Sequence, residues 1–273
     1  LLADSLRPVV KGNIEILGEG GDTGKPGRLF LNGLLIDGTV TVSAGNLGEL
    51  RLAHCTVKPE QGGRLVVESL PEKGKPNDEL TVTIDRSICG SIQAPEIMQG
   101  LRIIDSIIDS FVDPDDEAGY PAPAIAGDPG ESRPGPATTI ERSTIFGTVW
   151  VREMALASEV IFTEQVTAER LQTGCVRYSF VPLGSSVPRR FRCQPGLALT
   201  ALAKTKGSEP DEASQELVEE RLWPVHTSTD YGDPGYGQLS SACPEEIRRG
   251  AEDGSEMGVF NHLKQPQREA NLR

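Results

Sequence analysis

The chain has 273 residues, of which 30 are Gly, 20 are Pro and only 5% are aromatic, and its formal net charge at pH 7 is −13. So acidic a chain is poorly suited to binding nucleic acid, and no apolar run approaches the ~20 residues that a membrane-spanning helix requires. The five cysteines show no CxxC spacing, so the sequence supports neither a metal cluster nor a disulfide framework, and it indicates no cofactor. The ends read LLADSLRPVV and REANLR, and we expect both to be cuts in a longer chain.

After a lead-in at residues 1–27, short stretches of alternating apolar residues extend over residues 28–181. One of them, TIDRSICGSI at Thr83–Ile92, returns as TIERSTIFGTV at Thr139–Val149. Alternation with a period of two residues is typical of strands with one buried face. The recurrence therefore indicates that a strand-containing unit is repeated along this region.

The repeated units align on a column of small residues. This column contains Thr39, Cys55, Ser87, Ser106 and Ser143, with poorer matches at Glu159 and Cys175. Three positions earlier stand the apolar residues Ile36, Leu52, Ile84, Ile103 and Ile140. The first three members of the small column are separated by 16 and 32 residues, and Ser87 and Ser106 by 19, so we infer a period of 16–19 residues.

Strands that recur at this interval with one residue type per column predict an all-β solenoid, a parallel β-helix that we expect to be right-handed. Ile84, Ile103 and Ile140 would then form an inward ladder. Ser87, Ser106 and Ser143 would occupy equivalent corners, where bulky side chains would collide. An antiparallel sandwich could also space its strands evenly, but it would not require the same residue type in each column.

A charged column precedes the small one and reads His54, Arg86, Asp105 and Arg142. If the repeats containing Arg86 and Asp105 are adjacent, the two residues stand one strand spacing apart, ~4.8 Å. The column could be a charged binding row. It could also be a solvated ladder of ion pairs with small net value, which is the interpretation we favour.

An insertion at residues 113–136 interrupts the period with a Pro/Gly/Asp-rich segment. Clustered carboxylates at Asp113, Asp115 and Asp116 are weak candidates for a Ca²⁺ site. The segment lacks the D-x-D-x-D-G spacing of a Ca²⁺ loop, so a plain surface loop is the interpretation we favour. No other part of the chain suggests a metal site.

Residues 182–273 lose the strand alternation, and we expect a loop-rich and helical C-terminal cap that is truncated. Residues 208–223 read as a helix with Ser208 or Asp211 at its N-cap, and a short helix should follow Pro244. A further helix should begin within residues 265–273. The basic cluster of Arg189, Arg190 and Arg192 could bind an acidic partner or pair with acids elsewhere in the chain.

No nucleophile, zinc, P-loop or dinucleotide motif occurs, and the three histidines share no pattern. One enzymatic class remains as an alternative, the cleavage of polysaccharide. Glycoside hydrolysis needs two carboxylates about 5–9.5 Å apart, and the candidates in neighbouring repeats are Asp85, Asp105, Asp109 and Glu141. Aromatic residues that would stack on sugar rings are scarce, which weakens this alternative.

Three segments carry a resemblance to a known family: GCVRYSFVPLGSSVPRRFRCQP at Gly174–Pro195, YGDPGYGQLSSACPEEIRRGAEDGSEMG at Tyr231–Gly258, and QPQREANLR. Together they make residues 80–273 similar to uncharacterised bacterial β-helical proteins encoded with phage-tail-like contractile injection systems. The family has no established activity, so the resemblance assigns no role to individual residues.

The resemblance implies a structural or adhesive β-helical component of such a particle, as a tail fibre, spike or baseplate-peripheral protein. The alternative is a tailspike-like enzyme, a glycoside hydrolase or polysaccharide lyase. Expected partners are other subunits of the particle and, for an adhesin, cell-surface polysaccharide. We expect no partner nucleic acid and no membrane span, with assembly in the cytoplasm as part of a particle that could act outside the cell.

Overall fold

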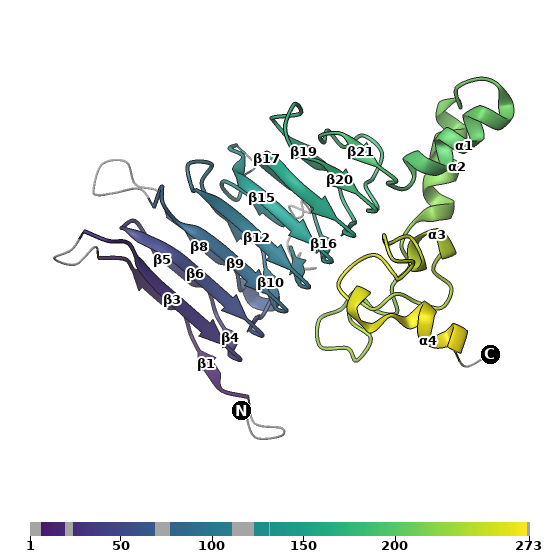
Figure 1. The fold of residues 1–273 in the computed structure, drawn as a ribbon. Helices are drawn as coiled ribbons and strands as arrows, with labels where there is room; N and C mark the ends of the chain where they lie inside the picture. Colours follow the sequence, from purple (N-terminus) through teal and green to yellow (C-terminus); the bar gives the residue numbers. More distant parts are fainter. Residues whose placement is uncertain (1–6, 20–23, 69–76, 111–122, 131, 272–273) are drawn as a thin grey trace.

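The computed structural model describes residues 7–19, 24–68, 77–110, 123–130 and 132–271. The strands lie side by side in a stack that starts at the N-terminal end, and the helices of the C-terminal region lie beyond and beside the far end of the stack (Figure 1). None of the described helices is long and apolar enough to cross a membrane.

Within the described residues, the smaller sheet has seven strands, and all of its pairings are parallel. In spatial order its strands are β1 (Val9–Lys11), β4 (Leu35–Asp37), β7 (Thr56–Val57), β10 (Ile88–Gly90), β13 (Ile107–Asp109), β16 (Thr144–Phe146) and β18 (Ile161–Phe162).

In the part of the chain that the structure describes, the larger sheet has fourteen strands, eleven of them on one continuous path. This path runs through β2 (Ile14–Leu17), β5 (Val40–Ser43), β8 (Leu65–Val67), β11 (Ile92–Gln93), β14 (Ile125–Ala126), β17 (Val149–Ser158), β15 (Gly135–Glu141), β12 (Gly100–Ile104), β9 (Thr81–Asp85), β6 (Leu47–Ala53) and β3 (Gly27–Asn32). Off the path lie β19 (Val166–Ala168), β20 (Val176–Arg177) and β21 (Arg190–Phe191).

The predicted fold class, a parallel β-helix solenoid, is wrong, because the eleven described strands on the continuous path of the larger sheet form a curled, parallel half-barrel. The ten-residue strand β17 makes this sheet continuous. Its first residues pair with β14 and β19, its residues from Val151 onward pair with β15, and its last two residues pair with β20. The segment VWVREMALAS contains no Gly, Pro, Asn or Asp, so nothing breaks the strand where the solenoid prediction required a corner.

The predicted register of the inward ladder is confirmed. Ile84 pairs with Ile103, Ile103 pairs with Ile140, and Leu52 pairs with Ile84. These four side chains are at most 1% exposed and belong to one apolar core that both sheets share. Burial of each such side chain contributes about 1.5–3 kcal/mol, so the ladder holds the parallel register by packing.

The predicted period of 16–19 residues fails in the first half of the chain. Strand β6 pairs directly with β9, so the 32 residues from Cys55 to Ser87 form one repeat and not two. Ile36 lies in β4 of the smaller sheet, and Leu31 of β3 takes the expected place beside Leu52. Loops of unequal length join strands of equal register, and this breaks the numerical period without disturbing the pairing.

The segment expected to be a surface loop, residues 113–136, contains strand β14. Ile125 pairs with both Ile92 and Val149, and it is fully buried with Ala126. Asp113, Asp115 and Asp116 lie outside the described residues, so the suggested Ca²⁺ site has no structural account. The Pro-rich composition of this segment concealed a short buried strand between its polar parts.

Four α-helices and two short 3₁₀ helices are described: α1 (Gly196–Lys206), α2 (Glu212–Leu222), α3 (Glu245–Arg248), α4 (Gln265–Asn271), η1 (Glu60–Gly62) and η2 (Asn261–Leu263). The helix expected within residues 208–223 is α2, and the Asp211 side chain caps it by accepting a hydrogen bond from the backbone N–H of Ser214. The helices expected after Pro244 and within residues 265–273 are α3 and α4.

Sequence reasoning missed α1, although its Ala, Leu and Lys residues favour a helix and Gly207 ends it in a left-handed conformation.

The C-terminal region packs against the outward face of the smaller sheet. Tyr236 and Val259 pack with Ile107, while Leu222, Ile247 and Met257 pack with Ile161 and Phe180. A glycine permits a close approach here, since Gly237 has φ +68° and an added Cβ would lie 2.8 Å from Ile107 Cδ1. In Figure 1 the C-terminal region, coloured yellow, therefore lies beside the lower ends of the strands.

Candidate functional site: a charged face along the larger sheet

A row of left-handed turns follows the strands of the larger sheet. His54, Arg86, Asp105 and Arg142 all have φ between 45° and 51°, and Glu159, Tyr178 and Arg192 continue the row. The backbone N–H of Arg86 donates to Ile104 O, and that of Asp105 donates to Glu141 O. The charged column of the sequence is therefore a structural row in which neighbouring members lie on adjacent strands.

The serines after these turns form a hydrogen-bonded ladder. Ser106 Oγ accepts from the backbone N–H of Ser87 at 3.0 Å and donates to its own strand at Ile104 O, 2.6 Å away. Ser143 repeats both contacts, accepting from Ser106 and donating to Glu141 O. This geometry confirms that the three serines occupy equivalent turns, and it explains the small column, because each hydroxyl replaces a backbone acceptor inside the turn.

The small column also has members that the sequence alignment misplaced. The residues after the last three turns are Val160, Ser179 and Cys193, so Glu159 stands one position early and Cys175 lies outside the column. Ser179 Oγ accepts from Val160 N and donates to Arg177 O, which extends the ladder to the last repeats. Cys193 uses its thiol in the same place, within hydrogen-bonding distance of two backbone carbonyls.

Three of the four candidate carboxylates lie in an ion-pair network on this face. Arg142 Nε lies 2.7 Å from Asp105 Oδ1, and Arg86 Nε lies 3.8 Å from Asp105 Oδ2, so both oxygens of Asp105 face a guanidinium group. Glu141 lies 3.2 Å from Arg102 and 3.5 Å from Arg142, and Arg51 lies 2.7 Å from Asp85. We call these seven residues the ion-pair network.

Burial and charge act in opposite directions on Arg142, the residue of the network that pairs with both Asp105 and Glu141. Burial alone would lower its pKa, but the hydrogen bond to Asp105 and the charges of Asp105, Glu141 and Glu159 outweigh it and raise the pKa. The Asp105 side chain is only 9% exposed, so its charge depends on these arginines for compensation. Each acid is thus committed to holding neighbouring strands together.

The fourth candidate, Asp109, lies on the smaller sheet at the end of β13. Tyr236 of the C-terminal region donates a hydrogen bond to its Oδ2 at 2.6 Å. Burial raises the pKa of Asp109, the hydrogen bond from Tyr236 opposes this, and the charge of Asp230 adds to it. The structure therefore uses Asp109 to hold the C-terminal region and does not bring it into the ion-pair network.

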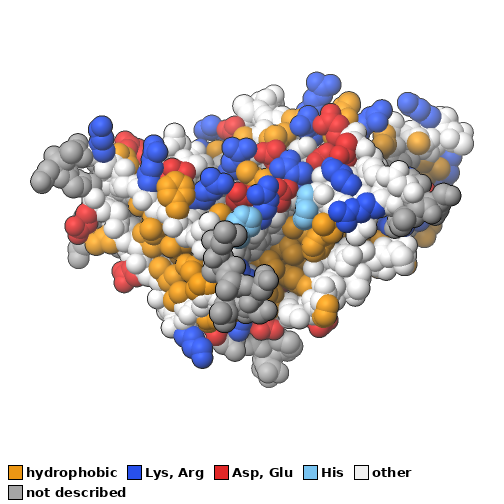
Figure 2. Space-filling view, turned by 60° about the horizontal axis from the view of Figure 1, so that its bottom comes forward, with side chains coloured by type: hydrophobic (Ala, Val, Ile, Leu, Met, Phe, Trp, Pro, Cys, Tyr) orange, Lys and Arg blue, Asp and Glu red, His pale blue; other side chains and the backbone are white. Residues whose placement is uncertain are grey.

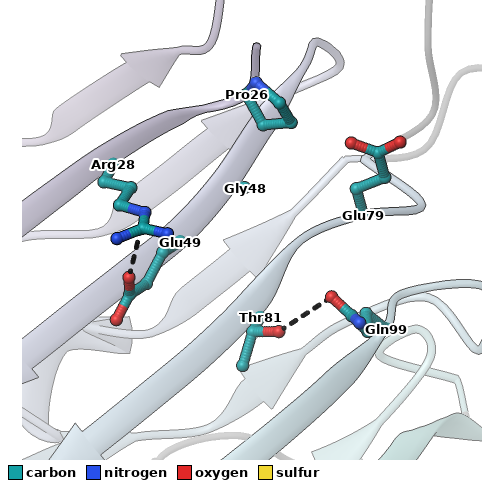
Figure 3. Close-up of a pocket in the computed structure, with 7 residues that line it drawn as sticks. All are labelled: Pro26, Arg28, Gly48, Glu49, Glu79, Thr81 and Gln99. Atoms are coloured by element: carbon teal, nitrogen blue, oxygen red, sulfur yellow. Dashed lines mark hydrogen bonds and ion pairs between the residues drawn. The ribbon is translucent and has the colours of Figure 1, made fainter.

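An open cavity of about 650 Å³ lies near the first residues of β3, β6, β9 and β12 (Figure 3). Its lining residues are Pro26, Arg28, Gly48, Glu49, Glu79, Thr81 and Gln99. Arg28 lies 3.6 Å from Glu49, and Thr81 donates to Gln99, so most of its polar groups are paired with each other. None of these seven residues is aromatic, so the cavity has no ring on which a sugar could stack.

Figure 2 shows acidic and basic side chains intermingled in a band across the molecule, above a region rich in hydrophobic side chains. Among the described residues, no three His, Cys, Asp or Glu side chains are placed to hold a metal ion. The five cysteines are free, and burial raises the pKa of Cys89 to about 12, as for a core thiol. Sequence reasoning missed Arg51 and Arg102, although their outward positions in alternating strands could have placed them beside the acids.

His226 is another residue that sequence reasoning did not single out. Its ring lies edge-on to Phe146 at a centroid distance of 5.1 Å, and its buried Nε2 has no hydrogen-bond partner. Burial lowers the pKa of His226 to about 4. It therefore behaves as a neutral packing residue between the C-terminal region and the smaller sheet.

No family model, no curated protein and no solved structure matches this chain.

Proposed function

We propose that this chain is a structural or adhesive subunit of a phage-tail-like contractile injection particle. The observation that carries the proposal is the commitment of Asp85, Asp105 and Glu141 to ion pairs between neighbouring strands. Acids held in this way stiffen a surface, because each of them joins its own strand to an arginine on a neighbouring strand.

Two further features support a rigid, load-carrying role. The serine ladder satisfies backbone groups inside consecutive turns, and the apolar ladder of Ile84, Ile103 and Ile140 continues the same register through the core. A strand inside a parallel sheet resists local opening, because it is held by a neighbouring strand on each side. The choice of a contractile injection particle as the assembly rests on the resemblance of Gly174–Pro195 and Tyr231–Gly258 to proteins encoded with such systems.

The enzymatic alternative has less support. A retaining or inverting glycosidase needs one carboxylic acid with a raised pKa close to a second carboxylate. Burial raises the pKa of one candidate, Asp109. Its carboxylate, however, accepts a hydrogen bond from Tyr236, and it lies on a different sheet from the other three candidates.

The test is to isolate tail-like particles from cells that express the intact native chain, by density-gradient centrifugation. Mass spectrometry of the fractions should find the chain in the particle peak, and its release should require conditions that dissociate the particle. A chain that stays in the fractions of free protein would contradict the proposal.

The enzymatic alternative is tested in parallel by incubating the purified chain with bacterial surface polysaccharides and assaying new reducing ends and unsaturated uronates. Activity that is lost in Asp105→Asn or Glu141→Gln would make the enzyme the better account.

A further inference from the structure

A cleft of about 230 Å³ lies where the last strands meet the C-terminal region. Its polar lining comes from Tyr178, Arg192 and Gln194 on one side and from Glu246, Arg249 and Glu252 on the other. These residues fall within Gly174–Pro195 and Tyr231–Gly258, two segments that lie far apart in the sequence and that the fold brings together here. The cleft is separate from the ion-pair network.

The cleft holds two arginines that lack an anionic partner. Neither Arg192 nor Arg249 forms an ion pair within the part of the chain that the structure describes, although the net charge of the protein is −13. The guanidinium carbon of Arg192 lies 6.0 Å from the Phe191 ring centre, a contact that uses none of its N–H donors. Two guanidinium groups with spare donors at one cleft suit a planar carboxylate, which they bind through paired hydrogen bonds.

The acids of the cleft limit what else can bind. Glu246 uses Oε1 to pair with Arg221 at 2.7 Å, and Glu252 uses Oε2 to pair with Arg177 at 3.8 Å. Each keeps a second oxygen that can accept a hydrogen bond. A ligand with several negative charges would be repelled by these acids, whereas a ligand with one carboxylate and several hydroxyl groups can satisfy both arginines and acids.

Neutral groups complete the set of donors. The carbonyl oxygen of the buried Gln194 side chain accepts from the backbone N–H of Ala198, which fixes the amide and leaves its NH₂ group to donate. Tyr178 is half-buried, with its ring held edge-on by Phe191 at 5.6 Å. A rigid ring next to polar groups is a common feature of sugar-binding sites, because the C–H face of the sugar packs on it while its hydroxyl groups are hydrogen-bonded.

We propose that this cleft binds a carboxylated sugar, such as a uronic acid residue of a cell-surface polysaccharide. Arg192 and Arg249 take the carboxylate, Glu246 and Glu252 accept from hydroxyl groups, and Tyr178 contacts the ring. The small volume fits one sugar unit at the end or on a branch of a chain. This inference rests on the proposed adhesive function and gives it a ligand class.

The experiment titrates the protein with methyl β-D-glucuronide and follows binding by saturation-transfer NMR. Methyl β-D-glucoside tests the need for the carboxylate, and glutarate and inorganic phosphate test whether any anion suffices. The variants Arg192→Gln and Arg249→Gln remove the two charges. Arg189→Gln is the matched control, because Arg189 is exposed, lies three residues from Arg192 and does not line the cleft.

The proposal expects glucuronide to bind at least about tenfold more tightly than glucoside, glutarate or phosphate, and each cleft variant to weaken it by about tenfold. Arg189→Gln should bind as the native protein does. No binding of glucuronide, or binding of glucoside, glutarate or phosphate that is as tight as that of glucuronide, would overturn it. A chain that co-migrates with the particle yet binds no glucuronide would refute only the cleft, and one that binds glucuronide but never joins a particle would refute only the subunit role.

Discussion

Removing one hydroxyl from the serine ladder should destabilise the fold by more than the loss of one exposed hydrogen bond. In Ser106→Ala the buried N–H of Ser87 loses the acceptor that lies 3.0 Å away, and the Ile104 carbonyl loses a donor at 2.6 Å. Ser106 is fully buried, so no bulk water reaches these groups directly. An unsatisfied buried donor costs about 1–3 kcal/mol, and we expect the free energy of unfolding to fall by about that amount.

Two matched variants separate the hydrogen bond from other effects. Ser241→Ala removes an exposed serine and should change the free energy of unfolding by less than about 0.5 kcal/mol. Ser106→Cys should be milder than Ser106→Ala, because Cys55 already occupies this column with its thiol 3.3 Å from Ala53 O. The assay is equilibrium unfolding in urea, comparing midpoints at constant slope. A Ser106→Ala midpoint equal to that of Ser241→Ala would refute the argument that the ladder satisfies backbone groups.

Three further predictions concern the C-terminal contact and the ion-pair network. Because the pKa of His226 falls from 6.5 to about 4 on folding, the stability it contributes is complete above pH 6.5 and is lost as the pH falls towards 4. His226→Gln removes this loss and should therefore reduce the fall of the urea midpoint between pH 7 and pH 4.5. Asp109 acts in the opposite direction, because its raised pKa lets the folded protein gain a proton there as the pH falls. Asp105→Asn should lower the free energy of unfolding, measured in urea, by about 1–3 kcal/mol. This is less than for a fully buried ion pair, because Arg142 is partly exposed, and an unchanged midpoint would show that the network does not stabilise the fold. Gly237→Ala should loosen the C-terminal region, seen as faster limited proteolysis after Trp223, because its φ is +68° and its Cβ would meet Ile107; cleavage at the native rate would contradict this packing.

The sequence by itself determined the local parts of this fold. Alternating residues around Ile84, Ile103 and Ile140 encode strands with one buried face, and their shared column encodes parallel register, since a slip of one residue would turn every apolar side chain outward. The recurrent Ser after a charged residue encoded the turn, and Asp211 encoded the start of α2. Each of these features depends on neighbours within a few residues or on the repetition itself.

The sequence also determined part of the charged face. Arg86 and Asp105 were expected one strand spacing apart from their column positions, and they form an ion pair. The involvement of Arg51 and Arg102 was not anticipated, because a long side chain reaches a neighbouring strand by a rotamer that the sequence does not specify. Which acid each of these arginines pairs with is decided by the acid that lies within reach on the adjacent strand.

Only the tertiary structure decided the continuity of the larger sheet and the contacts of the C-terminal region. Whether β17 stays extended or turns at its middle depends on simultaneous pairing with β14, β15, β19 and β20, which come from both sides of it in the chain. Asp109 and Tyr236 are 127 residues apart, and Arg192 and Arg249 meet at one cleft only because the C-terminal region folds back on the strands. Contacts between distant segments carry no local pattern, and their energy is realised only when the whole chain has packed.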